Sequence, residues 1–289
     1  MREITILSGK GGTGKTSITA ALASVAKSTV FCDNDVDAAD LHLLLHPTVE
    51  QSNTFFSGYQ AEVLRDNCNQ CYMCSDYCRF EAIQTNPDGA VYINPFHCEG
   101  CRLCERICPQ QAIVSHKNEN NYWYVSSTRF GTMVHAKMGA GEENSGKLVT
   151  RIRKQSREIA SNTLSKYVLN DGPPGIGCTA ISSLTGTNAV LLVTEPSRSA
   201  LHDVKRLVEL TKKFDAEVFA VINKYDINME ISGEIEHFFL EEDIRLIDKL
   251  PYDKIMVEAM IRGKTIVEYA YESEIANKIK KIWQEISKE

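Results

Sequence analysis

The sequence predicts an α/β fold with a doubly wound, mostly parallel sheet, into which a compact cysteine-rich module is inserted. Apolar runs of strand length alternate with helical patterns along most of the 289 residues. Alternation of this kind is typical of a parallel sheet covered on both faces. It stops between residues 62 and 116, where eight of the ten cysteines lie. Because surface loops tolerate insertions, we expect one discontinuous domain, 1–61 and 117–289, with an inserted domain at 62–116.

The first strand–helix–strand unit lies at the N-terminal end. Residues 2–8 form an apolar run, a helical pattern extends from about Thr16 to Lys27, and residues 29–32 resemble a second strand. Beyond the cysteine-rich segment, Ser145 is expected to cap a basic amphipathic helix from Gly146 to Asn162. The remaining strands are predicted at 121–126, 167–170, 189–194, 217–223 and 245–250.

Composition narrows the class of protein. Hydrophobic residues make up 43% and charged residues 24%, which is ordinary for a globular chain. The net charge of -6 and the lack of any Lys/Arg-rich run argue against nucleic-acid binding. No apolar run reaches the roughly 18 residues of a membrane span, and the first residues do not resemble a signal peptide. We therefore expect a cytoplasmic protein without stable membrane insertion, whose clustered cysteines bind metal rather than form disulfides.

A phosphate-binding loop follows the first strand. Residues 9–16 read Gly-Lys-Gly-Gly-Thr-Gly-Lys-Thr, which fits the pattern G-x-x-x-x-G-K-T between a strand and a helix. Glycines let backbone N–H groups wrap the phosphates, and the helix N-terminus adds the positive end of its dipole. Lys15 is expected to reach the β- and γ-phosphates, and Thr16 to bind Mg²⁺. The residues expected to contact nucleotide are Gly11, Gly12, Thr13, Gly14, Lys15, Thr16 and Ser17.

Two acidic strand ends are candidates for the metal site, since ligands bind at the carboxyl ends of parallel strands. Residues 32–37 read Cys-Asp-Asn-Asp-Val-Asp after the second strand. Residues 168–175 read Val-Leu-Asn-Asp-Gly-Pro-Pro-Gly, in which an apolar strand ends at Asp171. Asp171 is expected to hold Mg²⁺ through water, and Gly172 or Gly175 to sense the γ-phosphate.

With a second lysine, Lys10, the loop has the form Lys-Gly-Gly-x-Gly-Lys-Thr and resembles the deviant Walker A group. This group of ATPases includes MinD, ParA, the arsenite-pump ATPase and the nitrogenase iron protein. The resemblance implies that Lys10 crosses to the nucleotide of a second subunit in an ATP-sandwich dimer. It also implies that Asp35 orients the attacking water or touches Mg²⁺, while Asp33 supports the metal indirectly.

The same resemblance implies two contacts to the base. Asn223 ends the strand Val-Ile-Asn and corresponds to the asparagine that binds the adenine edge in the family. The loop that contains Pro251 corresponds to the family loop that packs on the base. Both motifs are short, and both contacts to the base are expectations that the resemblance implies.

The cysteines form two runs that repeat with a period of 30 residues: Cys68-x₂-Cys71-x₂-Cys74-x₃-Cys78 and Cys98-x₂-Cys101-x₂-Cys104-x₃-Cys108-Pro109. Three closely spaced thiolates wrap one 4Fe–4S cubane, and in two-cluster ferredoxins the fourth cysteine of each run binds the other cluster. We therefore expect one cluster on Cys68, Cys71, Cys74 and Cys108, and another on Cys98, Cys101, Cys104 and Cys78. Structural zinc is the alternative, although zinc sites rarely use three such cysteines in series.

Arg79 follows Cys78 where the bacterial ferredoxin pattern has proline. The change removes no ligand, but it alters the loop near the second cluster and so the potential of that cluster. Together, the motifs resemble the MinD-superfamily ATPases that contain an inserted ferredoxin domain, over nearly the whole chain. Residues 141–147 also resemble family sequence, without a physical role beyond a helix cap.

Two cysteines lie outside the runs. Cys178 is seven residues after Asp171, the offset at which the nitrogenase iron protein has a ligand for a cluster shared between subunits. That protein's second ligand has no match here, so a small buried residue is the preferred interpretation. Cys32 is expected to be a buried strand residue.

The sequence is compatible with three functions. The first is an ATP-gated electron carrier, which needs a redox partner protein. The second is an assembly factor or carrier for metal clusters, as in the related Mrp group, which needs a cluster-accepting partner. The third is a positioning ATPase whose clusters sense redox state; insertion of the C-terminal helical segment into a membrane would support it, although core packing is favoured. All three assume ATP or ADP, Mg²⁺, and an ATP-dependent homodimer or a heterodimer with a related ATPase.

Overall fold

The structure is a computed structural model that describes residues 1–56, 58–139 and 145–288. The chain divides into two compact units. The first comprises Met1–Ser52, Trp123–Lys137 and Ser145–Glu289. The second comprises Asn53–Tyr122 and Met138–Asn144, of which residues 140–144 lie outside the described part. The predicted insertion, 62–116, lies within the second unit.

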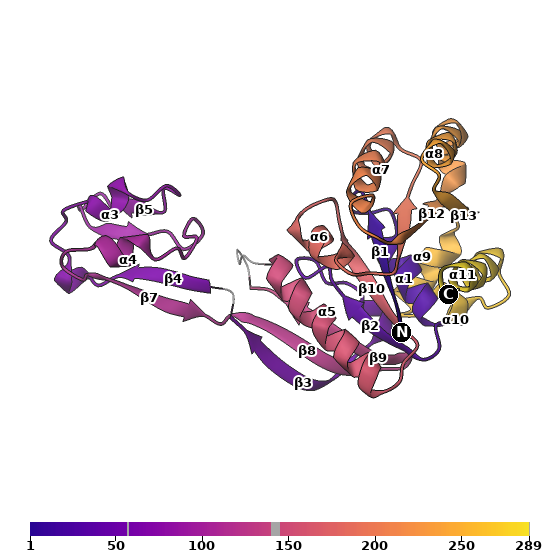
Figure 1. Ribbon diagram of the computed structural model, residues 1–289, viewed down its shortest axis with the longest axis horizontal. Helices are drawn as coiled ribbons and strands as arrows, with labels where there is room; N and C mark the ends of the chain where they lie inside the picture. Colours follow the sequence, from indigo (N-terminus) through magenta and orange to yellow (C-terminus); the bar gives the residue numbers. More distant parts are fainter. Residues whose placement is uncertain (57, 140–144, 289) are drawn as a thin grey trace. The chain divides into compact units, whose positions relative to one another are not determined.

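One sheet forms the centre of the first unit (Figure 1). Its strands are β1 (Arg2–Ser8), β2 (Thr29–Asp33), β3 (Thr48–Phe55), β8 (Asn121–Thr128), β9 (Gly131–Lys137), β10 (Tyr167–Pro174), β11 (Ala189–Thr194), β12 (Glu217–Asn223) and β13 (Arg245–Leu250). They lie in the order β13-β12-β11-β1-β10-β2-β9-β8-β3. All neighbours from β13 to β9 pair in parallel, which confirms the mostly parallel α/β sheet that the alternation predicts.

Helices cover both faces of this sheet (Figure 1). One face packs on α1 (Lys15–Ala23), α2 (His42–Leu45), α9 (Lys254–Ile261), α10 (Ile266–Tyr269) and α11 (Glu274–Ile286). The other packs on α5 (Ser145–Asn162), α6 (Cys178–Leu184), α7 (Arg198–Thr211) and α8 (Met229–Glu241); a short 3-10 turn, Tyr225–Ile227, precedes α8. The sheet is covered on both faces because its strands carry apolar residues on both. In strand β1, Ile4 and Ile6 belong to the hydrophobic core on one face, and Leu7 belongs to the core on the other.

Two elements differ from their predicted bounds. Helix α1 ends at Ala23, not at Lys27, because the chain turns at Ser24, whose hydroxyl donates to the carbonyl of Ala21 at 2.6 Å. Strand β10 continues to Pro174, beyond its predicted end at Asn170. Gly172 permits this, since a Cβ there would lie 2.6 Å from the carbonyl oxygen of Ile6. The helix predicted from Gly146 begins at Ser145, and the residues of the 141–147 stretch that precede it lie outside the described part.

The C-terminal helix α11 packs in the core of the first unit. Its apolar residues are buried against the sheet and α1: Ile275, Ile279, Ile282, Trp283 and Ile286. Core packing is therefore confirmed for this helix, and the feature that would have supported a membrane-inserting positioning ATPase is not found in it. Among the described helices, none combines the length and the apolar character that a membrane span needs.

The second unit contains two small antiparallel pairs of strands. The longer pair, β4 (Gly58–Val63) and β7 (Ile113–Asn118), joins the two ends of the unit. The shorter pair is β5 (Ile83–Thr85) and β6 (Val91–Ile93). Short helices carry part of each cysteine run, namely α3 (Met73–Asp76) and α4 (Leu103–Ile107), and a 3-10 turn at Arg65–Asn67 precedes the first run.

The 30-residue repeat of the sequence is also a repeat of backbone conformation. Left-handed residues occur in pairs that are 30 positions apart: Gln70 and Gly100, Tyr72 and Arg102, Glu81 and Gln111. The Ala-Ile dipeptides of the two halves, at 82–83 and 112–113, are all buried. Each cysteine run therefore folds in the same way, so that equivalent positions of the two runs can be compared directly.

Candidate functional site

The phosphate-binding loop joins β1 to α1 in the first unit. Gly12 and Gly14 have φ angles of 83° and 88°, in the left-handed region that favours glycine. A Cβ at Gly14 would also lie 2.4 Å from Nδ2 of Asn223, so no other residue fits there without displacing that side chain. At Gly11 and Gly12, by contrast, a Cβ would meet no atom within 4 Å. The loop is therefore closely packed at Gly14 and open to solvent or ligand at Gly11 and Gly12.

Lys15, Thr16 and Asp171 meet at the start of α1. The ammonium of Lys15 lies 2.9 Å from Oδ1 of Asp171, and the hydroxyl of Thr16 donates to Oδ2 at 2.8 Å. Thr19, one turn further along α1, donates to Oδ1 at 2.7 Å. Asp171 is fully buried, and these three side chains satisfy both oxygens of its carboxylate. The structure thus brings the predicted residues Lys15, Thr16 and Asp171 into contact, and it adds Thr19 to them.

Two further carboxylates surround the same lysine. Oδ2 of Asp35 lies 3.8 Å from the Lys15 ammonium, and burial raises the pKa of Asp35 to about 6 although Lys15 opposes the shift. Asp33 is fully buried and accepts backbone N–H groups of Asp35 and Leu41, each at 3.2 Å. Its burial, and then the charge of Asp171, raise the pKa of Asp33 well above its ordinary value. Lys15 thus contacts two carboxylates, those of Asp35 and Asp171, and the buried Asp33 lies next to Asp35; carboxylate oxygens are the ligands that Mg²⁺ prefers.

Lys10 lies at the other end of the loop and is held within the chain. Its ammonium lies 2.9 Å from Oε1 of Glu195 and donates to the hydroxyls of Ser197 and Ser199 at 3.0 and 3.2 Å. Oε2 of Glu195 lies 3.0 Å from the ammonium of Lys224, which also donates to the carbonyl of Gly12. Burial acts to raise the pKa of Glu195, but the two lysines outweigh it and hold that pKa below its ordinary value.

The residues expected near the base occupy different settings. Asn223 is buried, and its Nδ2 donates to the carbonyl of Thr13 at 2.8 Å while Oδ1 accepts the N–H of Lys224. One N–H of the amide and one lone pair of Oδ1 are thus left for a contact to adenine. Pro251 is half-buried, and Tyr252 beside it is tied to Asp226 through its backbone N–H. The hydroxyl of Ser17 donates to the sulfur of Met260 in α9.

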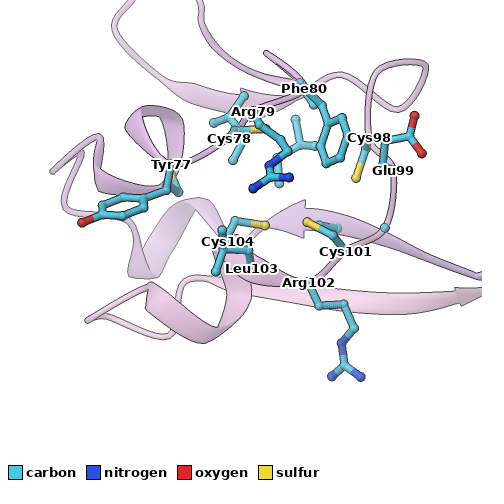
Figure 2. A pocket seen from close by; sticks show the side chains of 16 residues that line it. Tyr77, Cys78, Arg79, Phe80, Cys98, Glu99, Cys101, Arg102, Leu103 and Cys104 are labelled. Carbon is cyan, nitrogen blue, oxygen red and sulfur yellow. The ribbon is translucent and has the colours of Figure 1, made fainter.

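The eight clustered cysteines lie in the second unit, around two pockets. One pocket, of about 250 Å³, is lined by Cys78, Cys98, Cys101 and Cys104, together with Cys74 (Figure 2). Apolar side chains, among them Ala82 and Ile83, line the rest of it. The sulfurs of Cys98, Cys101 and Cys104 face the space in Figure 2. The fourth cysteine of the first run is therefore grouped with three cysteines of the second.

The other pocket is narrower, at about 20 Å³. It is lined by Cys68, Cys71, Cys74 and Cys108, with Pro109 and the buried Ala112 and Ile113. Here the fourth cysteine of the second run is grouped with three of the first. Cys74 lines both pockets.

Cys74 and Cys104 are the inner cysteines of the two sets. Burial raises the pKa of the Cys104 thiol to about 11, and the neighbouring thiols Cys98, Cys101 and Cys74 add to this shift. Burial likewise raises the pKa of Cys74, with Cys108, Cys68 and Cys71 as its neighbours. Over the residues that the structure describes, no three His, Cys, Asp or Glu side chains converge as they would around a single metal ion.

The two remaining cysteines differ from each other. Cys32 is buried as expected, and burial raises the pKa of its thiol to about 12. Cys178, by contrast, is exposed, so the prediction of a buried residue is wrong. The reason is its place at the first position of α6, where the chain leaves the loop after β10; its sulfur lies 3.9 Å from the hydroxyl oxygen of Ser145.

Comparison with known protein families decides the class of the first unit. The model of the CobQ/CobB/MinD/ParA nucleotide-binding domain family matches residues 4–266. The chain belongs to this family. The match includes the phosphate-binding loop, both acidic strand ends and the segment that forms the second unit.

Three relatives of this MinD/ParA-family chain are informative. An uncharacterized protein of Methanocaldococcus jannaschii is 31% identical over 98% of this chain and 96% of its own length. A protein of Pyrococcus horikoshii named iron-sulfur cluster carrier protein is 24% identical over 92% of this chain and 79% of its own length. The septum site-determining protein MinD of P. horikoshii, solved with Mg-ADP, has the same fold, with a TM-score of 0.59 at 20% identity; the similarity covers 99% of this chain and 96% of that one.

Sequence reasoning missed three polar residues of this MinD/ParA-family site. Thr19 supports Asp171, while Glu195 and Lys224 hold Lys10 and the loop. Glu195 follows β11 directly, and Lys224 follows β12, so both occupy carboxyl ends of central parallel strands. The rule that pointed to Asp171 could have pointed to them as well. Thr19 gave no such signal, because a threonine one turn into a helix is common.

Proposed function

We propose that the chain is an ATP-hydrolysing iron–sulfur protein, in which a nucleotide-driven dimer switch controls electron transfer through two 4Fe–4S clusters. The observation that carries the proposal is the exchange of the fourth cysteines between the two runs. That exchange is the arrangement of two-cluster ferredoxins, and it occurs here in a chain with a complete phosphate-binding loop. When bound, each cluster would accept and release one electron, between a low-potential protein donor and an acceptor protein.

The donor set of the second unit supports this choice of cofactor. A cubane offers one iron to each of four thiolates, so its ligands surround a volume and do not converge on one ion, as around zinc. The pocket of about 250 Å³ has that form, and apolar residues line the rest of its wall. The pocket of about 20 Å³ has the right thiols, but the loops around it must open to admit a cluster. Shared lining by Cys74 would keep the two clusters close.

The first unit supports nucleotide binding. The hydroxyl of Thr13, in the phosphate-binding loop, is buried and has no hydrogen-bond partner among the described residues, which suits a residue that awaits a ligand. We assign Lys15 to the β- and γ-phosphates, and Thr16 and Asp171 to Mg²⁺ with support from Asp33. To reach the phosphates, Lys15 must exchange Asp171 for them, which frees the carboxylate for the metal. Asp35 would then orient the attacking water.

The intrachain contacts of Lys10 suggest how the dimer is controlled. In the proposed ATP dimer, Lys10 reaches the nucleotide of the second subunit and must therefore leave Glu195. The ion pair between them, 2.9 Å long and about four-fifths buried on the glutamate side, stabilises the separate chain. Glu195 thus acts against dimerisation, and the γ-phosphate supplies a competing partner for Lys10.

Glu195→Gln is expected to favour the dimer. Removal of the charge weakens the tether of Lys10, so the apparent dissociation constant of the dimer, measured with a non-hydrolysable ATP analogue, should fall about two- to fivefold. Sedimentation velocity across a dilution series measures it. Glu217→Gln is the matched control, since Glu217 pairs with Arg2 at the start of β12, at the opposite end of the sheet from the loop. An unchanged or weaker dimer in Glu195→Gln would contradict the tether.

Connections within the first unit could pass the state of the nucleotide towards the second. Strand β2, which ends at Asp33, pairs with β9, and β9 follows β8, the strand through which the chain returns from the second unit. Helix α5 starts where the chain next returns, and its Arg153 donates to the carbonyls of Ser182 and Thr185, at the end of α6. Helix α6 follows the glycine loop after β10. Both connections thus begin at elements that are expected to respond to the γ-phosphate.

ATP binding is expected to shift the reduction potential of the clusters. An allosteric coupling of about 1–3 kcal/mol corresponds to a shift of roughly 40–130 mV for a one-electron couple. A spectroscopic redox titration with and without a non-hydrolysable ATP analogue measures the shift. The variant Lys15→Ala, which loses the phosphate contacts, should show none. By reciprocity, oxidised and reduced protein must differ in affinity for the analogue by the same factor.

A second candidate function is supported by one comparison. The P. horikoshii relative is named iron-sulfur cluster carrier protein, which favours a role in which the clusters are delivered and not only reduced. The two functions predict different results in the same titration. If the analogue leaves the potentials unchanged while ATP stimulates transfer of a cluster to an apo-protein, the carrier replaces the electron-transfer proposal.

A further inference from the structure

The two cysteine pockets differ in charge. Among the described residues that line the pocket of Cys68, Cys71, Cys74 and Cys108, no side chain is charged, and Arg65 lines a separate, adjoining pocket with Cys68. The pocket of Cys78, Cys98, Cys101 and Cys104 is lined by three charged residues, Arg79, Glu99 and Arg102. We call these the neutral pocket and the charged pocket. The difference concerns the cofactor directly, because net charge and hydrogen bonds around a cluster set its reduction potential.

Only one of the three charges is directed at the charged pocket and unpaired. Arg102 bonds Glu105 at 2.8 Å and lies over the ring of Tyr59, and Figure 2 shows its side chain extending away from the pocket. The carboxylate of Glu99 also points outward in Figure 2. The guanidinium of Arg79 points into the space between the sulfurs (Figure 2), and the structure records no hydrogen bond or ion pair between it and any described residue.

The repeat provides an internal comparison for this arginine. Arg79 follows Cys78, and Pro109 occupies the equivalent position, 30 residues later, after Cys108. Arg79 lines the charged pocket, and Pro109 lines the neutral one. Because the two runs fold alike, the replacement of proline by arginine is a difference at one defined position beside each cluster site. A cation with five N–H donors therefore stands where the other half has a ring without charge or N–H.

We infer that Arg79 raises the reduction potential of the cluster in the charged pocket above that of its neighbour, so that this cluster holds the electron between donor and acceptor. The inference rests on the proposed iron–sulfur function. One-electron reduction adds one negative charge to the site, and the guanidinium of Arg79 stabilises that charge by Coulomb attraction and by hydrogen bonds to sulfur. Arginine keeps its charge at every physiological pH, so its effect is constant.

The test is an EPR-monitored redox titration of the full-length, cluster-loaded protein, with dithionite as the one-electron reductant. In Arg79→Gln, the ratio of reduced to oxidised cluster at a fixed potential should fall about tenfold for the one-electron wave that has the higher midpoint in wild type, a shift of 59 mV. The other wave should keep its midpoint. Arg79→Lys keeps the charge and should recover most of the shift. The matched control is Arg106→Gln, which removes an exposed cation that lines neither pocket and should leave both waves nearly unchanged.

Salt separates an effect of charge from an effect of packing. Raising the ionic strength from about 0.1 M to about 1 M shortens the Debye length from about 10 Å to about 3 Å. The difference in midpoint potential between wild type and Arg79→Gln should therefore shrink, since Arg79 is exposed to solvent. If both clusters are present in Arg79→Gln but neither wave moves, or both move equally, the role of Arg79 is overturned and the iron–sulfur proposal stands. If the loaded wild-type protein gives no 4Fe–4S signal, both are overturned.

Discussion

Replacing Cys78 together with Cys98 is expected to remove one cluster, and replacing Cys78 together with Cys68 is expected to remove both. The reason is the grouping of the cysteines, since Cys78 lines the pocket of Cys98 and not that of Cys68. Alanine is the substitution of choice because it leaves no ligating atom. Anaerobically loaded wild-type protein should contain about eight irons per chain, Cys78→Ala/Cys98→Ala about four, and Cys78→Ala/Cys68→Ala close to none.

The two double variants are matched controls for each other, because each lacks two cysteines, one of which is Cys78, and they differ only in whether the second comes from the second run or the first. If each run bound its own cluster, the iron contents of the two variants would be reversed. Equal losses in both would mean that the sites do not load separately. Stoichiometric zinc, without charge-transfer absorbance near 400 nm, would remove the ferredoxin interpretation altogether. ATP binding should stay largely intact in both variants, since the phosphate-binding loop lies in the other unit.

Lys15→Ala is expected to abolish ATP hydrolysis, with a fall in turnover of about a hundredfold or more. The buried ammonium is the positive group nearest to Asp171 and Asp35, and we assign it to the charge that develops on the transferred phosphoryl group. Its removal also leaves the carboxylate of Asp171 buried without a counter-charge, at a cost of about 3–5 kcal/mol to the nucleotide-free protein. Phosphate release measures the first effect, and chemical denaturation measures the second.

The control for this variant is Lys27→Ala. Lys27 is exposed, just beyond α1, and makes no contribution to the loop, so its removal should change neither turnover nor stability appreciably. Added Mg²⁺ should restore part of the stability of Lys15→Ala, because the cation would replace the missing positive charge at Asp171. Turnover at the wild-type rate in Lys15→Ala would exclude the proposed catalytic role of this lysine.

The central strand β11 could be predicted from sequence because it is apolar over almost its whole length. Residues 189–194 are all buried, and the predicted strand has the observed bounds. The phosphate-binding loop was equally accessible, since its chemistry is carried by adjacent residues. Edge strand β3 could not be predicted in this way: Thr48–Phe55 is mostly polar and exposed, and only pairing with a distant strand makes it part of the sheet.

Contacts between distant residues account for what was missed at the site. The role of the Glu195 carboxylate depends on its ion pairs with Lys10 and Lys224, which lie far from it in sequence. The exposure of Cys178 depends on where α6 starts relative to the sheet, which no local pattern encodes. The outward or inward direction of Arg79, Glu99 and Arg102 likewise follows from the folded loops. Sequence therefore predicted which residues have suitable chemistry, and the structure was needed to say which of them face one another.

The exchange of cysteines between the two runs has a mechanical consequence for the second unit. Each proposed cluster would join the two halves of the repeat, because three of its ligands come from one run and one from the other. A protease that cuts the turn at residues 86–90, between β5 and β6, would break the chain between Cys78 and Cys98. The fragments of the loaded protein would nevertheless stay together, joined through iron. Removal of the clusters by oxidation or by a chelator would take away these links and leave the two halves of the cut module joined by the β4–β7 pair.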